Sequence, residues 1–174
     1  MDDIKLVQNL EDHLEVHLSA AIWRSKNCPV YSKVWDPELY CKQSYLEEFY
    51  EEQAFTLYIN GLPSAAVVMY GEGQAKYSKE ANVKNPNRIK DSKILYIDDL
   101  AVKEDLIGKG IFAELLQKIN EYAREQGYEV LRMDTDKRLV SLVNCYLRNG
   151  FIIVSEDCDE HEERTSVFFE KNVL

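Results

Sequence analysis

The sequence lacks closely spaced cysteines. Its four cysteines, Cys28, Cys41, Cys145 and Cys158, are scattered without a C-x-x-C pair. This spacing predicts reduced thiols rather than disulfides or a cysteine-based zinc site. Internal repeats, low-complexity tracts and linker-like segments are also missing, so the 174 residues are expected to form one domain spanning 1–174.

A long apolar run is absent as well, which excludes a membrane-spanning helix. The composition, 45% hydrophobic and 30% charged, is typical of a soluble globular protein. The N-terminus begins Met1-Asp2-Asp3 and does not show the basic and then apolar layout of a signal peptide. A cytoplasmic location is therefore expected.

Positive charge is scarce. The chain has 21 lysines and arginines against 31 aspartates and glutamates, a net charge of −10. This balance argues against nucleic acid or an anionic membrane as a partner and is compatible with a cationic small molecule or peptide. His13 and His17 are one helical turn apart, but no third ligand is evident and their order is not H-E-x-x-H. They are expected to be solvated, and no metal site is predicted.

Apolar periodicity and turn residues predict an alternation of strands and helices. Strands are expected at 4–7, 55–59, 65–70, 94–102, 129–135, 151–155 and 166–170, and helices at 10–25, 37–52, 111–125 and 139–148. Asn60-Gly61 indicates a hairpin turn. The polar stretch 71–92 is predicted to be a functional or mobile connection, and the acidic stretch 156–163 a solvated hairpin tip.

The central stretch is an apolar strand that passes through glycines into an amphipathic helix. Asp98 and Asp99 lie within this strand, and Gly108-Lys109-Gly110 precedes the helix. A glycine-rich turn at a helix start lets backbone N–H groups approach an anion such as a pyrophosphate. By itself, the same pattern is also common in tight turns that bind nothing.

A dinucleotide-binding motif is one alternative. Gly108, Gly110 and Ala113 fit G-x-G-x-x-G/A, and Asp134 follows at the end of the next expected strand. Only some 60 residues follow the turn, however, and they end in an expected antiparallel hairpin rather than repeated βαβ units. This alternative therefore ranks lower.

Three segments together resemble the GCN5-related N-acetyltransferase (GNAT) superfamily. Asp99-Leu100-Ala101-Val102 is similar to its L-A-V strand, and residues 107–112 align with its Q/R-x-x-G-x-G/A loop. Met133-Asp134-Thr135, Leu142-Val143 and 146–151 are similar to a late L-D-T, L-V and Y-x-x-x-G-F pattern. Departures occur at Ile107, Phe112 and Leu139, where family members usually have Gln or Arg, Gly or Ala, and Asn.

The resemblance implies an α+β fold (an α/β/α sandwich) with a mixed, mostly antiparallel sheet flanked by helices. It implies direct transfer of an acetyl group from acetyl-CoA to a primary amine of a small molecule or peptide, without a metal. Cofactor contacts would come from Leu100, Ala101, Val102, Ile107, Gly108, Lys109, Gly110, Ile111 and Phe112.

Tyr146 matches the residue that protonates the coenzyme A sulfur, and Asp98 is the expected base or amine-binding residue. Asp98 and Asp99 should point to opposite faces of their strand unless a bulge intervenes, which leaves open which of them faces the substrate groove. A non-catalytic acyl-CoA-binding module of the same fold is a further alternative. A homodimer is left open.

Overall fold

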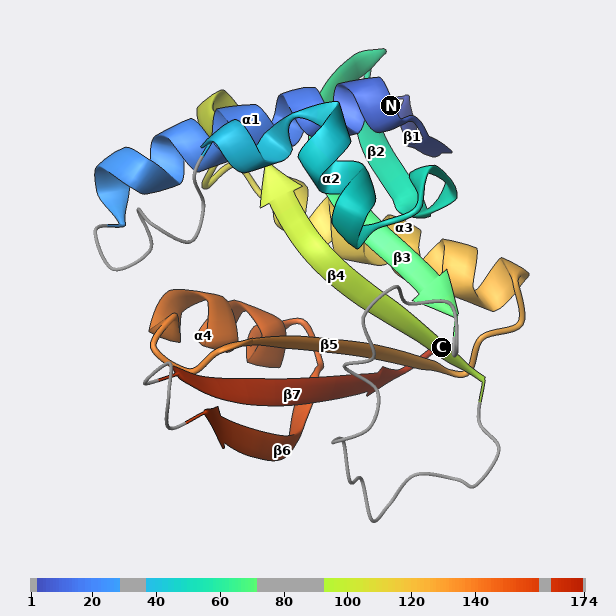
Figure 1. Cartoon of the computed structure of the whole chain (residues 1–174). Helices are drawn as coiled ribbons and strands as arrows, with labels where there is room; N and C mark the ends of the chain where they lie inside the picture. Colours follow the sequence, from blue (N-terminus) through green and yellow to red (C-terminus); the bar gives the residue numbers. More distant parts are fainter. Residues whose placement is uncertain (1–2, 29–36, 72–92, 160–163, 174) are drawn as a thin grey trace. The chain divides into compact units, whose positions relative to one another are not determined.

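The protein is described here by a computed structural model, which covers residues 3–28, 37–71, 93–159 and 164–173. The predicted connection 71–92 falls almost wholly outside these residues. Figure 1 shows the elements in chain order. They are β1 (Ile4–Gln8), α1 (Leu10–Asn27), α2 (Lys42–Glu48), β2 (Ala54–Ile59), β3 (Leu62–Gly71), β4 (Ile94–Val102), α3 (Ile111–Glu125), β5 (Val130–Asp136), α4 (Val140–Arg148), β6 (Ile152–Asp159) and β7 (Arg164–Asn172).

The strands form one mixed sheet of seven in the order β1-β2-β3-β4-β5-β7-β6. The β1-β2, β2-β3, β5-β7 and β6-β7 pairs are antiparallel, whereas β4 and β5 run parallel. A doubly wound dinucleotide-binding sheet is mostly parallel, so this topology agrees with the expected α+β class and disfavours the dinucleotide alternative.

The chain divides into two compact units. The first comprises residues 1–69 and 99–119, and the second comprises residues 70–98 and 120–174. Both β4 and α3 therefore change unit along their length. No helix among the described residues is long and apolar enough to cross a membrane.

In the first unit, α1 packs on β2, and small residues let the elements approach closely. Its core cluster contains Val16, Ala20, Ala66 and Ala101. Asn60 and Gly61 have φ of 52° and 79°, as a type I′ hairpin turn requires, so the predicted hairpin is confirmed. The β3 strand begins directly after this turn, at Leu62 rather than at residue 65.

The buried face of α1 differs from the predicted one. Apolar periodicity predicts a buried face made of Leu10, Leu14, Leu18, Ala21 and Ile22. In the structure Leu18 is exposed, and the buried set includes His13 and His17. The prediction that the two histidines are solvated is therefore wrong. Apolar periodicity misplaces this face because it counts histidine as polar, whereas the His13 ring finds hydrogen-bond partners inside the protein.

The predicted helix 37–52 is also wrong as one continuous element. It consists of a 3₁₀ turn at Pro37–Tyr40, α2, and another 3₁₀ turn at Glu51–Gln53. Cys41 and Phe49 have extended backbones, with ψ of 149° and 158°, and these interrupt the helix. The side chains of Cys41 and Ser44 then hydrogen-bond at the start of α2.

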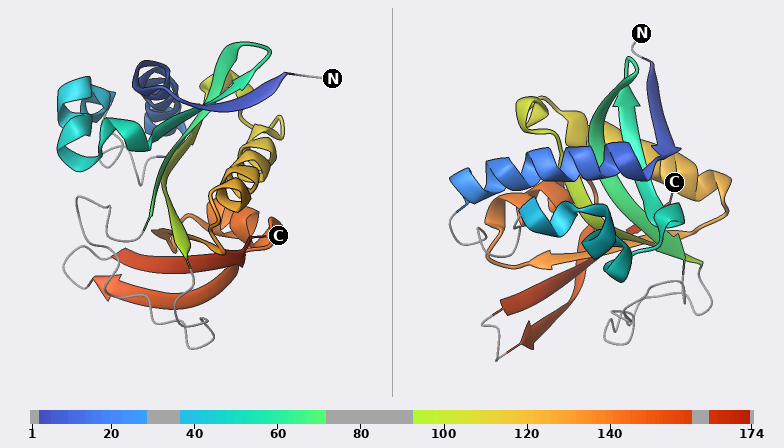
Figure 2. Two further views of the ribbon diagram at one scale, coloured as in Figure 1. Left: turned by 90° about the vertical axis from the view of Figure 1, so that its right-hand side faces the viewer. Right: turned by 45° about the horizontal axis from the view of Figure 1, so that its top comes forward.

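In the second unit, β5, β7 and β6 form a curved antiparallel ladder (Figure 2). The ladder extends further than predicted, since β6 continues to Asp159 and β7 begins at Arg164. Glu156, Asp157 and Asp159 consequently lie in a strand rather than in a loop, and residues 160–163 of the expected tip fall outside the described residues. In the ladder register these three residues lie opposite Val167, Ser166 and Arg164 of β7.

Candidate active site

The β4 strand loses its regular alternation where it carries the two adjacent carboxylates. Asp99 has φ of 43°, a left-handed conformation that is rare for a residue other than glycine. The Tyr70 hydroxyl donates to the Asp98 carboxylate at 3.4 Å in the second unit. In the first unit, the Asp99 carboxylate lies 3.5 Å from Nε2 of His17. The two acidic side chains thus have different neighbours, Tyr70 for Asp98 and His17 for Asp99.

The predicted pyrophosphate turn contains two glycines whose positive φ angles few other residues adopt. Gly108 and Gly110 have φ of 80° and 83°, and a Cβ built on either one meets no atom within 4 Å. The backbone is therefore openly approachable where α3 begins. The first N–H groups of a helix have no partner within it and favour an anion. Lys109 is exposed between the glycines and adds positive charge. This turn fits a pyrophosphate group.

The two unusual residues of this turn are partly exposed. Ile107 and Phe112 stand where family members usually have Gln or Arg and Gly or Ala, and Phe112 is half-buried at the first turn of α3. Ile107 comes directly before Gly108, and Ile111 and Phe112 come directly after Gly110. All three belong to the first unit.

The predicted cofactor-binding segment Leu100–Val102 lies at the end of β4. Arg24 on α1 donates from Nη2 to the Leu100 carbonyl at 2.8 Å. That carbonyl is thus already engaged by the protein, whereas Ala101 is buried in the α1 core cluster. All the predicted cofactor-binding residues belong to the first unit, while Asp98 and Tyr146 belong to the second.

Tyr146 on α4 is almost fully buried, at 2% exposure. Its ring packs edge-on against Phe169, with centroids 5.2 Å apart, and against Phe151. Neighbouring Cys145 is half-buried, and burial raises the pKa of its thiol. A raised pKa disfavours the reactive thiolate, so this environment favours a packing role for Cys145 over a nucleophilic one.

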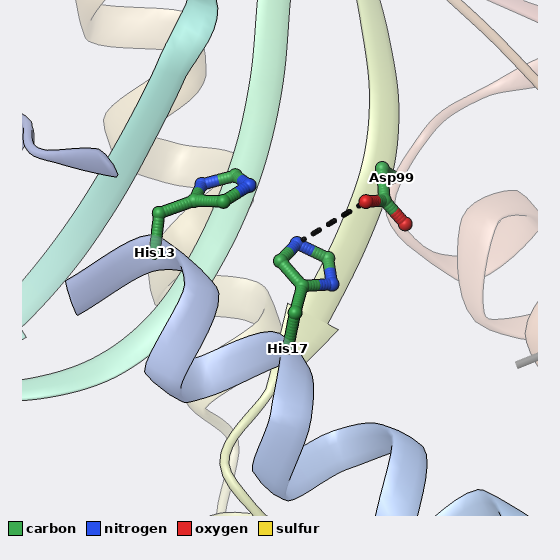
Figure 3. A group of neighbouring side chains, drawn as sticks. All are labelled: His13, His17 and Asp99. Carbon is green, nitrogen blue, oxygen red and sulfur yellow. Dashed lines mark ion pairs between the residues drawn. The ribbon is translucent and has the colours of Figure 1, made fainter. Parts of the chain in front are cut away.

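A cluster that the sequence analysis did not assemble lies between α1 and β4 in the first unit. His13 and His17 are fully buried, and Asp99 faces them (Figure 3). The ring of His17 stacks on Tyr40 with centroids 5.0 Å apart. The i,i+4 histidine spacing was the available signal, but the third member is more than 80 residues away in the chain.

The titratable groups of this cluster are strongly perturbed. Burial, together with the neighbouring His17, lowers the pKa of His13 to about 3. Burial also lowers the pKa of His17 well below its ordinary value, with the charge of Arg24 adding to the effect. Both imidazoles are therefore neutral at neutral pH. Burial and the Asp99 charge raise the pKa of Tyr40 above its ordinary value.

The sequence of residues 20–151 matches the model of the acetyltransferase (GNAT) family. The chain belongs to that family. It is accordingly a GNAT-type acyltransferase, and acetyl-CoA is the donor that the family uses. No match was found among curated proteins.

Many solved structures share the fold of this GNAT chain. Ard1 from Thermoplasma volcanium has a TM-score of 0.64 at 17% identity, with 99% of this chain and 98% of that chain covered. PaiA N-acetyltransferase from Thermoplasma acidophilum, in complex with coenzyme A, has a TM-score of 0.63 at 18% identity, with 98% and 99% covered. The ribosomal-protein-S18-alanine N-acetyltransferase from Escherichia coli has a TM-score of 0.63 at 13% identity, with 99% and 94% covered. At these identities the likeness shows the fold alone.

Proposed function

We propose that the protein transfers an acetyl group from acetyl-CoA directly to a primary amine of a small molecule or peptide. The observation that carries the proposal is the order of features along β4 and α3. A strand with a left-handed residue leads through Leu100–Val102 to a two-glycine turn that leaves backbone open to a pyrophosphate. The four free cysteines support a reducing, cytoplasmic setting.

The cofactor would be held mainly by backbone groups. Residues 107–112 cradle the pyrophosphate, and Lys109 adds charge. The carbonyl of Leu100 is engaged by Arg24, so we assign the pantetheine contacts to the remaining backbone groups of Leu100–Val102. Direct transfer then needs a neutral amine, a donor for the developing oxyanion and a proton for the leaving thiolate.

In the proposed reaction, the amine nitrogen attacks the thioester carbonyl carbon and the C–S bond breaks. Asp98 binds the ammonium group or accepts its proton, directly or through water. Tyr146 donates its hydroxyl proton to the coenzyme A thiolate, and neither a covalent acetyl-enzyme nor a metal takes part. The net charge of −10 favours a cationic acceptor.

The decisive experiment follows release of free thiol from acetyl-CoA in the presence of a panel of amines. Amine-dependent release is expected. Binding of acetyl-CoA without release for any amine would support the non-catalytic binding module instead. Thermal stabilisation by NAD but not by acetyl-CoA would contradict the proposal, since only a ligand of the native state stabilises it.

A variant of the glycine turn tests the cofactor assignment. Gly110→Val places a branched side chain where the pyrophosphate would approach, so coenzyme A should bind more weakly by calorimetry. Gly61→Val is a matched control, because Gly61 has a similar φ of 79° and equally open surroundings. Equal affinities in the two variants would mean that the α3 turn is only structural.

The acid assignment is tested by Tyr146→Phe, which keeps the packed ring and removes one hydroxyl. Turnover should fall by about 10²-fold, the lower end of general acid catalysis, with little change in KM for acetyl-CoA. Cys145→Ala is the neighbouring control and should be nearly silent. Full turnover in Tyr146→Phe would exclude its hydroxyl as the acid, and loss of activity in a folded Cys145→Ala would favour a covalent route.

A further inference from the structure

The histidine cluster converges on a common point. His13 and His17 extend from consecutive turns of α1, and the Asp99 carboxylate reaches toward them from β4 (Figure 3). One potential ligand atom from each residue lies within 4.8 Å of the other two. It is the one group of this kind among the described residues, and all three residues belong to the first unit.

We propose that His13, His17 and Asp99 form a binding site for a divalent transition-metal ion of the zinc type. Two imidazole nitrogens and a carboxylate oxygen match the ligands that Zn²⁺ takes, with a fourth position left for water or a neighbouring oxygen. Imidazole ligands favour Zn²⁺, Co²⁺ or Ni²⁺ over Mg²⁺ and Ca²⁺, which prefer sites made of oxygens.

The state of His17 points independently to a missing ligand. Its side chain is completely buried, and neither ring nitrogen has a hydrogen bond of ordinary geometry among the described residues. The 3.5 Å approach of Nε2 to Asp99 is too long to be a good one. A buried polar group left without a partner is costly. A metal ion bound to His17 would remove this cost.

The surroundings of His13 orient it as a ligand. Its Nδ1–H donates to the Phe55 carbonyl at 3.0 Å, which leaves the Nε2 lone pair facing the cluster. Metal-binding histidines commonly donate their second nitrogen to a backbone carbonyl in this way. The Tyr45 hydroxyl now donates to Nε2, so it must release this lone pair when a metal binds.

Asp99 connects the site to solvent. Its side chain is 19% exposed, whereas both histidines are fully buried, so an ion can enter along the carboxylate. The left-handed backbone of Asp99 sets the direction of this side chain. A bound ion would tie α1 to β4 and stabilise the first unit. The proposed acetyl transfer does not use this ion, so either proposal can fail without the other.

The test begins with whole protein stripped by a chelator and titrated with Zn²⁺ and with Co²⁺. Calorimetry should show one ion per chain, and Tm should rise with Zn²⁺ but not with Mg²⁺ or Ca²⁺. Bound Co²⁺ should give the visible absorption of a low-coordinate site. Absence of 1:1 binding by the wild-type protein would overturn the proposal, whatever the variants do.

Variants then assign the ligands. His17→Gln and Asp99→Asn should each weaken Zn²⁺ binding by at least about 10–100-fold, the effect usual even for residues that only support a ligand. His161→Gln removes the chain's third histidine, which lies outside the described residues, and should change nothing. Binding that survives His17→Gln and Asp99→Asn but is lost in His161→Gln would overturn the assignment.

Tyr45→Phe separates the metal site from a purely structural cluster. Because the hydroxyl competes for the His13 lone pair, the variant should bind Zn²⁺ at least as tightly as the wild type. Weaker binding in folded Tyr45→Phe protein would contradict the arrangement proposed for His13.

Discussion

Each unit of the molecule contains a buried polar cluster, and the hydrogen bonds of these two clusters are satisfied to different degrees. In the second unit, Arg132 on β5 and Glu170 on β7 are 2% and 5% exposed. The Nε of Arg132 donates to Glu170 at 2.8 Å, its Nη2 donates to the same carboxylate, and its Nη1 donates to the Tyr96 hydroxyl at 3.2 Å. In the first unit, His17 is equally buried, but neither of its ring nitrogens has a hydrogen bond of ordinary geometry within the part of the chain that the structure describes.

This difference in hydrogen bonding distinguishes a polar cluster that stabilises the fold from one that we propose binds a metal ion. Arg132 and Glu170 are opposite each other in the β5-β7 ladder, so strand pairing itself positions them. His17 and Asp99 come from a helix and an irregular point of a strand. Altering the cluster whose hydrogen bonds are satisfied should destabilise the protein. Replacing the poorly hydrogen-bonded His17 by an apolar residue should leave its stability level or raise it.

The largest effect is expected from breaking the satisfied cluster. Glu170→Leu leaves the Arg132 guanidinium buried without its carboxylate and should lower the free energy of unfolding by about 3–5 kcal/mol. Urea unfolding measures the loss. The double variant Arg132→Met with Glu170→Leu removes both charges and should recover most of it; a double variant as unstable as the single one would mean that packing, not charge, is at stake.

The opposite sign is expected in the first unit. In chelator-treated protein, His17→Phe replaces an imidazole that makes no hydrogen bond of ordinary geometry among the described residues. The apolar ring that replaces it can still stack on Tyr40. The free energy of unfolding should stay level or rise by about 1–3 kcal/mol, the cost of an unsatisfied buried group. A clear loss of stability would show that the His17 nitrogens have partners in solution and would remove the contrast between the clusters.

Helix capping gives a smaller effect. Here the first unit has the satisfied group and the second unit does not. The Asn9 side chain caps α1 by accepting from the Asp12 backbone N–H at 3.1 Å, whereas Leu139 at the start of α4 makes no side-chain cap. Asn9→Ala should cost about 1 kcal/mol, and Leu139→Asn should add up to about that amount. Thermal unfolding measures both. No gain in Leu139→Asn would indicate that the α4 start cannot adopt capping geometry.

The smallest effect is a difference in thiol reactivity. A hydrogen bond with Ser44 lowers the pKa of exposed Cys41, whereas burial raises the pKa of Cys145. Because the thiolate is the nucleophile, Cys41 should react with iodoacetamide severalfold faster and at lower pH. Peptide mapping after timed labelling compares them. Equal rates would mean that α4 opens readily enough to expose Cys145.

Much of the fold follows from local sequence signals. The Asn60-Gly61 turn, the strand at 94–102, and the glycines that begin and end α3 act on neighbouring residues, and the structure agrees with them. The breaks in the expected helix 37–52 were not visible because Cys41 and Phe49 are not helix breakers by composition. Their extended backbones depend on the surrounding packing.

Only part of the candidate site could be predicted from the sequence. The α3 turn has a compact motif, and its backbone is open at both glycines, but its role in cofactor binding stays a prediction. The His13, His17 and Asp99 cluster could not be found from the sequence, because the three residues are distant along the chain and only the tertiary fold brings α1 and the end of β4 together. The roles of Asp98 and Tyr146 stay predictions, since they depend on chemistry with substrates.

The acidic residues of β6 have a consequence for self-association. This strand ends the sheet order, and such an edge offers unpaired backbone groups to any other strand. Ile152 and Ile153 are exposed there, and Glu156, Asp157 and Asp159 follow them. Two copies meeting edge to edge would bring like charges together. The same carboxylates should thus discourage fibre-like growth until acid neutralises them.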